Sequence, residues 1–274
     1  MKKVILVLVS FFLVQFSQAQ NKLKGNKNVT TQHREIDNFN AILIKNNLHV
    51  SISESPNGKV SVETDENLQI AVETRVTNGI LEVYLSQPIA RKKKLNIIVG
   101  VTDSIQKIEV RDNASLIGEN EIHCTNMNIV AQDNASLKLK FRLNNLIATI
   151  DDRSDATIET STKDDVIIAL DHNADLKLKT TCDKLSVNVS ESSLLKASGN
   201  CKDLEIISND NGSFKGKELL TDNATVQATD RSDVYINASK KLVVNIENNA
   251  ELYIYDNPEL IIEKFSDKAT LFKK

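Results

Sequence analysis

The chain has 274 residues, a formal net charge of −3, 41% hydrophobic residues and no tryptophan. The weakly acidic balance argues against nucleic acid and anionic membranes as partners. With only 4% aromatic residues, the chain also lacks the aromatic platforms that usually line a sugar-cleaving groove.

Residues 1–19 have the pattern of a secretory signal peptide. Lysines at positions 2 and 3 precede an apolar run at 4–16, and Ser-Gln-Ala at 17–19 is a small-x-small cleavage site. We therefore expect an exported protein whose mature chain begins at Gln20, located in the periplasm or at the cell surface. The apolar run is too short to span a membrane and no later segment is long enough, so no transmembrane segment is expected.

Residues 20–35 are polar and are predicted to be a flexible lead-in. The next segment, 36–107, is rich in short alternating apolar runs, and Asn78-Gly79 between two of them indicates a hairpin turn. This segment does not keep a regular spacing. We interpret it as irregular opening coils, widened by insertions, which cap the end of the fold and cover its sheet edge.

From residue 108 to 274 a short motif recurs, and its clearest form is Asp-Asn-Ala-Ser. The copies begin at Asp112, Asp133, Asp152, His172, Glu191, Asp210, Asp230 and Asn248, and a degenerate ninth begins at Ser266. The interval between successive first positions is nearly constant along the chain. A fixed period of about 19 residues is typical of a stacked solenoid.

Apolar and polar residues alternate on both sides of each motif, which predicts two half-buried strands joined by a tight corner. The third motif position is always small, as an inward-facing corner requires. Asn at the second position tolerates a left-handed backbone. The sequence predicts an all-β fold, a single-stranded right-handed parallel β-helix with rungs of about 19 residues. It forms one domain, 36–274, with regular rungs over 108–274.

The order of these features resembles the GIN-type head domain family, whose name describes an autotransporter adhesin head. The resemblance rests on Phe39-Asn40-Ala41-Ile42, on the Asn-Gly turn within 76–81, on Ile97-Ile98-Val99-Gly100 and on the repeated small-residue corners. It covers nearly the whole mature chain. It implies an exported bacterial β-helix protein, and the family's molecular function is not established. This sequence favours Asp-Asn-Ala corners where the family more often has Gly-Ser or Gly-Ala.

Three aspartates, Asp112, Asp133 and Asp152, begin successive copies of the motif. Carboxylates stacked about 4.8 Å apart repel one another, and a bound Ca²⁺ relieves that repulsion. The alternative is corner chemistry, in which each Asp accepts hydrogen bonds from its own turn. His172 and Glu191 interrupt the column, as a purely structural preference allows.

Cys182 and Cys201 are one rung apart, and the separation of stacked neighbours lies within the range for a disulfide. Export to an oxidising compartment favours the bond, whereas parallel side-chain directions favour two buried thiols. Tyr235, Tyr253 and Tyr255 face outward on late rungs and form a candidate partner patch. Cross-rung stacking on a solvated sheet explains them equally well.

No nucleophile motif, phosphate loop or metal-ligand spacing is found, so we assign no catalytic residue, cofactor or bound metal. The sequence favours a non-enzymatic adhesin-like or structural module of the cell envelope, with an envelope glycan or protein as partner. The main alternative is a carbohydrate-active enzyme on the same scaffold. Its groove needs long loops, and only residues 53–107 could supply them. A periplasmic factor acting through a protein partner is a third possibility.

Overall fold

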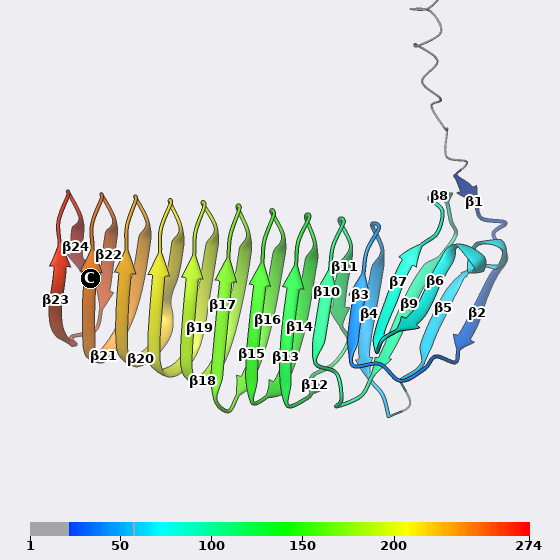
Figure 1. The fold of residues 1–274 in the computed structure, drawn as a ribbon, viewed down its shortest axis with the longest axis horizontal. Coiled ribbons are helices and arrows are strands. Elements are labelled where there is room, and N and C mark those ends of the chain that lie inside the picture. The colour runs from blue at the N-terminus through cyan, green and yellow to red at the C-terminus, as the bar shows by residue number, and fades with distance from the viewer. Residues whose placement is uncertain (1–21, 57) are drawn as a thin grey trace, which may run out of the picture.

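The computed structural model describes residues 22–56 and 58–274 and is an all-β solenoid (Figure 1). The expected signal peptide and the cleavage point at Gln20 lie outside the described residues. Within those residues, the one helix is the short 3-10 helix η1 (Glu66–Ala71). No helix among them has the length and apolar character needed to cross a membrane.

Each rung consists of a leading strand, a four-residue corner and a trailing strand. The leading strands are β3 (Ala41–Ile44), β10 (Lys107–Val110), β13 (Asn126–Ala131), β15 (Asn145–Ile150), β17 (Asp165–Leu170) and β23 (Glu259–Phe265). The trailing strands are β4 (His49–Glu54), β11 (Ser115–Gly118) with β12 (Ile122–His123), β14 (Ser136–Leu143), β16 (Asp155–Thr162), β22 (Glu251–Tyr255) and β24 (Thr270–Lys273). Between them a trailing strand runs unbroken into the next leading strand, in β18 (Asp175–Val189), β19 (Leu194–Ser208), β20 (Ser213–Ala228) and β21 (Asp233–Ile246).

Successive rungs pair in parallel and mostly in unbroken register, as β14 does with β16 from Ser136↔Asp155 to Leu143↔Thr162. In Figure 1 the leading strands lie in front and rise to the corners, and the trailing strands descend behind them while the chain advances away from the N-terminal sheet. That path is a right-handed coil. About nine turns of about 19 residues occupy 107–273, which confirms the predicted β-helix.

The core lies between the leading and trailing strands. In β14, Leu137, Leu139, Phe141 and Leu143 are buried, and the lysines and arginine between them are exposed. The same alternation on the rungs before the last joins the buried side chains into one cluster that runs from Ile42 to Ala269, whereas no residue of β23 is buried. Outward side chains consequently form straight columns along the rod, because each rung repeats the register of the previous one.

The N-terminal sheet closes one end of this rod. Strands β7 (Ile80–Leu85) and β9 (Leu95–Val101) pair in parallel with β3 and β4, on the side opposite β10 and β11. The first rung is therefore enclosed between the cap and the later rungs. The remaining cap elements are β1 (Leu23–Lys24), β2 (Val29–Arg34), β5 (Val60–Asp65), β6 (Val72–Thr77) and β8 (Ile89–Arg91).

The prediction of widened opening coils is only half right. β7 and β9 do extend the coil, but β5 pairs antiparallel with β9 and β6 antiparallel with β7. The hairpin predicted at Asn78-Gly79 is confirmed, with Thr77 facing Ile80 and φ values of 51° and 77° in the turn. Antiparallel strands fold the chain back over the open end and so protect the edge.

The expected flexible lead-in at 20–35 is wrong for its second half. β2 pairs antiparallel with β5 over six residues, from Val29↔Asp65 to Arg34↔Val60. The Arg34 guanidinium then donates to the backbone carbonyl of Gln69 at 2.8 Å. β-Branched residues at the start of this segment favour a strand, and the partner edge of β5 supplies the hydrogen bonds.

Asp65 anchors this segment from inside the cap. Its buried carboxylate accepts hydrogen bonds from the backbone N–H groups of Lys27 at 2.5 Å and Lys93 at 2.7 Å. Burial raises the pKa of Asp65, but the backbone N–H groups of Lys93 and Lys27 lower it more, so its pKa lies below the usual value. A Cβ at Gly25 would lie 2.5 Å from the Asp65 carboxyl carbon, so glycine is required there.

Candidate functional site

The corners are tight turns with an unusual backbone. In each of the nine corners from Asp112 onward, the first two residues have φ between +46° and +64°. In the first of them the Ala114 N–H donates to the Arg111 carbonyl at 3.1 Å. Two left-handed residues inside such a hydrogen bond make a type I′ turn, which favours Asn, Asp and Gly at both central positions. The Asp-Asn preference is therefore a backbone requirement.

The corners are also joined to one another. The N–H of each second residue donates to the carbonyl of the first residue on the next rung, as Asn113 does to Asp133 at 2.9 Å. The third residue is buried, as predicted, with Ala114 and Ala174 fully enclosed. The ninth corner begins at Asp267, one residue after the predicted Ser266, because a register shift in β23 lengthens that rung.

The three aspartates proposed for calcium do lie at the start of successive corners and are exposed. Among the described residues, however, neither Asp112 nor Asp133 joins a group of three side chains with ligand atoms within 4.8 Å of one another. The structure therefore places the column as expected without building a cation cage from it.

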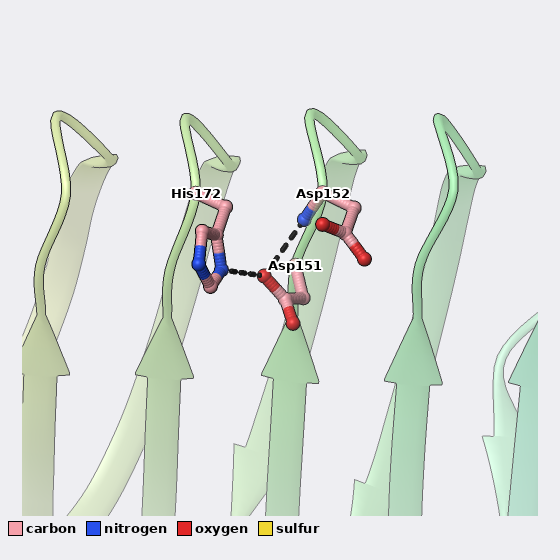
Figure 2. Close-up of side chains that lie close together, drawn as sticks. All are labelled: Asp151, Asp152 and His172. Carbon is pink, nitrogen blue, oxygen red and sulfur yellow. Dashed lines mark hydrogen bonds and ion pairs between the residues drawn. The ribbon is translucent and has the colours of Figure 1, made fainter.

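His172 is the centre of the acidic cluster that does form (Figure 2). Its Nδ1 lies 2.8 Å from Asp151 Oδ1, on the preceding rung, and its Nε2 lies 3.1 Å from Glu191 Oε2, on the following one. Two groups result, one with Asp151 and Asp152 and one with Asp171 and Glu191. The sequence showed His172 only as an interruption of the aspartate column, because its partners come from neighbouring rungs.

The carboxylates around His172 favour the protonated form of its imidazole. The hydrogen bond to Asp151 raises the pKa of the imidazole above 6.5, and the charges of Asp171 and Glu191 add to the effect. His172 thus contacts carboxylates from three successive rungs, those of Asp151, Asp171 and Glu191. The same nitrogen and oxygen atoms are ligands that transition metals accept, but every member of the cluster is partly or fully exposed.

The aromatic residues on the late rungs stack on one another. Tyr235 and Tyr253 have ring centroids 4.3 Å apart, and Tyr253 stacks on Phe272 at 4.7 Å. Tyr255 is not in this stack, and the Lys217 ammonium lies 5.3 Å from its ring centroid. Phe272 was not recognised from the sequence, although it follows Tyr253 by one repeat period. Both faces of Tyr253 are covered by Tyr235 and Phe272, so the centre of this patch offers a ring edge to a partner.

The two cysteines expected to be neighbours are paired residue to residue on β18 and β19. Both are buried and both are free thiols in the structure. The hydrogen bond to Cys201, together with burial, raises the pKa of the Cys182 thiol. Cys124 lies apart from them, and burial together with Glu54 raises its pKa to about 11.

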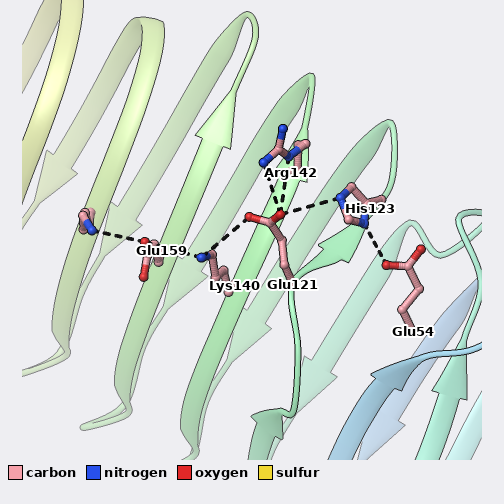
Figure 3. A network of polar contacts seen from close by, with 7 residues as sticks. Glu54, Glu121, His123, Lys140, Arg142 and Glu159 are labelled. Carbon is pink, nitrogen blue, oxygen red and sulfur yellow. Dashed lines mark hydrogen bonds and ion pairs between the residues drawn. The ribbon is translucent and has the colours of Figure 1, made fainter.

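A chain of ion pairs crosses the outer surface of the trailing strands (Figure 3). His123 contacts Glu54 at 2.8 Å, and Glu121 contacts both Lys140 and Arg142. Glu159 continues the chain between Lys140 and Lys179, at 3.8 and 3.2 Å. Acids and bases thus alternate from rung to rung, which relieves repulsion between stacked like charges.

Comparisons with known proteins point to one family. The model of the family described as "Putative auto-transporter adhesin, head GIN domain" matches residues 38–167 and 153–258. None of the curated proteins matches the chain.

Solved structures share the fold at low sequence identity. A "putative adhesin" from Parabacteroides merdae superposes with a TM-score of 0.67 at 16% identity, covering 92% of this chain and 99% of its own. A "putative adhesin" from Parabacteroides distasonis gives 0.69 at 13% identity, covering 93% and 100%. A "Putative lipid binding protein" from the same species gives 0.64 at 16% identity, covering 92% and 99%.

Proposed function

The chain belongs to the family described as "Putative auto-transporter adhesin, head GIN domain", and from that premise we propose that it is an exported, non-enzymatic binding module of the cell envelope. It acts in the periplasm or at the cell surface, and its partner is an extended envelope polymer, a glycan in the first instance. One observation carries the proposal. The in-register rungs align outward side chains into straight columns, so polar and charged groups recur along the rod at one-rung intervals.

Such columns suit a partner that is itself repetitive. A single outward side chain contributes little to binding, but many equivalent contacts along one polymer raise the overall affinity by effective concentration. The elongated shape provides the length for those contacts (Figure 1). A compact ligand gains nothing from this repetition.

The enzyme alternative requires a groove bordered by long loops. The segment expected to supply them, 53–107, is instead folded largely into the cap strands β5 to β9. This placement favours binding over cleavage. The two Asp-Arg-Ser-Asp corners, at 152–155 and 230–233, lie on separate rungs and do not form one site.

A glycan-array screen of the protein, with and without Ca²⁺, tests the proposal. We expect binding to linear glycans without release of reducing ends. Calcium-dependent binding would assign the Asp112, Asp133 and Asp152 column a role in the site. Release of reducing sugar would support the enzyme alternative, and binding to no glycan would refute the glycan proposal and direct attention to protein partners. Fractionation of cells carrying the natural protein distinguishes periplasm from surface.

A further inference from the structure

Three lysines on the trailing strands break the charge alternation seen elsewhere. Lys177, Lys196 and Lys215 are paired residue to residue on β18, β19 and β20, and all three point outward. We call them the lysine ladder. Their spacing along the rod is that of adjacent parallel strands, about 4.8 Å. Like charges placed directly opposite on neighbouring strands are destabilising, so the fold itself does not favour this arrangement.

The ladder has no ion-pair partner within the described residues. No carboxylate oxygen there lies within 4.0 Å of any of the three ammonium groups. One column away, Lys179 contacts Glu159 at 3.2 Å in the network of Figure 3. At the start of the leading strands, Lys184 alternates with Asp165 and Asp203, and its ammonium contacts Glu205 at 2.9 Å. The chain therefore forms ion pairs at other stacked lysines and none within 4.0 Å at these three, although Asp233 lies near enough to Lys215 to feel its charge, and Asp155 and Asp175 lie beside Lys177.

The ladder borders a shallow groove of about 460 Å³. Small residues form part of its floor, where Ala197 is buried and Ser198 faces the groove. One wall comes from a bulge in β20. Lys215 and Glu218 of β20 pair with Lys196 and Ser198 of β19. Two residues separate the first pair along the chain and one separates the second, so β20 carries one extra residue there.

The bulge adds a further cation to the ladder and to Lys179, which also lines the groove. Lys217 lines the same groove as the ladder. Gly216 makes the bulge possible, because a Cβ there would collide with the Phe214 ring. Bulges of this kind commonly redirect side chains beside a site. Two acids, Glu159 and Glu218, also line the groove, and Glu159 already contacts Lys140 and Lys179.

The same column continues as aromatic residues. Lys215 pairs with Tyr235, and Tyr235 pairs with Tyr253. A ligand lying along the ladder therefore meets three ammonium groups in a row and then phenol edges. This sequence of groups suits a chain with repeated anions and many hydroxyls. It suits nucleic acid less well, because both faces of Tyr253 are covered by Tyr235 and Phe272 and cannot stack on bases.

We propose that the lysine ladder and Lys217 bind a linear acidic polysaccharide, whose carboxylate or sulfate groups lie along the rod axis. The proposal rests on the proposed function and specifies its ligand class. A carboxylated and a sulfated chain present the same kind of anion array, so the experiment must separate them.

The test compares four polymers by biolayer interferometry: polygalacturonate, chondroitin sulfate, neutral pullulan and single-stranded DNA. The variant K177Q/K196Q/K215Q removes the ladder, and K92Q/K163Q/K241Q removes the same charge from exposed lysines elsewhere. We expect one acidic polysaccharide to bind, with affinity that falls from about 50 to about 200 mM salt. The ladder variant should bind about tenfold or more weakly and the control variant about as well as the original protein.

Several results overturn the proposal. Equal losses in both variants mean that binding reflects overall charge. DNA binding as tight as glycan binding, and equally dependent on the ladder, assigns the groove to nucleic acid. Neutral glycan binding that the ladder variant retains leaves the proposed function intact and refutes the acidic ligand. If the glycan array is positive but none of the four polymers binds, the proposed function also stands and the acidic ligand is refuted. Thermal unfolding of each variant, followed by circular dichroism, establishes that the fold is retained.

Discussion

The Ser154 hydroxyl accepts a hydrogen bond from the backbone N–H of Ala135, one rung earlier, at 3.1 Å. Ser193 does the same for Ala174 at the same distance. In these two corners the serine thus satisfies a buried N–H of its neighbour while remaining small enough for the corner, whereas the Ser232 hydroxyl donates to the carbonyl oxygens of Ser208 and Thr229. This contact explains why serine as well as alanine occurs at that position.

Replacing Ser154 with alanine should lower the free energy of unfolding by about 1 kcal/mol, because the Ala135 N–H loses its partner inside the rod. Urea denaturation of S154A measures the change. Ser136 is exposed at the start of β14 and serves as a control, since S136A should change stability by less than about 0.5 kcal/mol. Equal effects of the two changes would contradict the role assigned to the Ser154 hydroxyl.

The corner backbone predicts a distinctive substitution pattern at Asn134, where φ is +61°. Alanine there should cost about 1 kcal/mol, because a Cβ is unfavourable in the left-handed region, and glycine should cost less. The control is Asn128, which lies on a regular strand and faces outward. Denaturant midpoints for N134A, N134G and N128A give the comparison. If N134G is the least stable of the three, the type I′ assignment is wrong.

The imidazole of His172 should titrate above pH 6.5, because its hydrogen bond to Asp151 holds the proton. A raised folded-state pKa means that this contribution to stability is complete below the unfolded pKa and is lost as pH rises through the folded pKa. Two-dimensional NMR of the imidazole resonances measures the titration. In D151N the pKa should fall, and an unchanged value would show that Asp151 is not the main cause.

Asp65 should make the cap sensitive to acid. Its folded-state pKa lies below the ordinary value, so its contribution is present above about pH 4 and is lost as pH falls through the folded pKa. Hydrogen exchange of D65N should show faster exchange at Lys27 and Lys93, whose N–H groups bond to that carboxylate. D37N changes an exposed acid and should leave both amides protected. Unchanged exchange in D65N would refute the anchoring role.

The cysteines should remain thiols that react slowly. The raised pKa values of Cys182 and Cys124 leave little thiolate at neutral pH in the folded protein, and Cys201, whose pKa is lowered by its hydrogen bond with Cys182, is buried away from the reagent. Iodoacetamide labelling followed by mass spectrometry should find all three cysteines modified only after unfolding. Labelling of Cys124 alone in denaturant, without reductant, would instead establish the Cys182–Cys201 disulfide that export favours.

The repeated part of the fold could be predicted because every rung makes the same demands on its residues. Each rung needs a small residue at the third corner position and two strands of alternating apolar and polar residues. This pattern therefore recurs in the sequence once per rung. The ladder recurs in the same way, since Lys177, Lys196 and Lys215 follow one another at exact repeats of the same interval. The ladder could not be identified from the sequence alone. Its distinguishing property is that neighbouring columns contain ion pairs, and those ion pairs are seen only in the structure.

The cap could not be predicted in the same way. Its strands pair with partners at unequal separations, as β2 does with β5 and β3 with β7. The corner at Asn46-Asn47 was missed for a related reason, because the next corner, at Asp112, follows only after the whole cap. Similarly, the groove beside Ala197 depends on a single extra residue in β20, which the approximate repeat period conceals.

The placement of the first rung between cap and solenoid has a consequence for assembly. All strands of the cap find partners within residues 23–101, and each later rung pairs with the one immediately before it. A chain that emerges N-terminus first from an export channel can therefore complete a nucleus early and elongate from it one coil at a time. No later coil requires sequence that has yet to emerge, so growth proceeds in one direction and every step closes only a short loop.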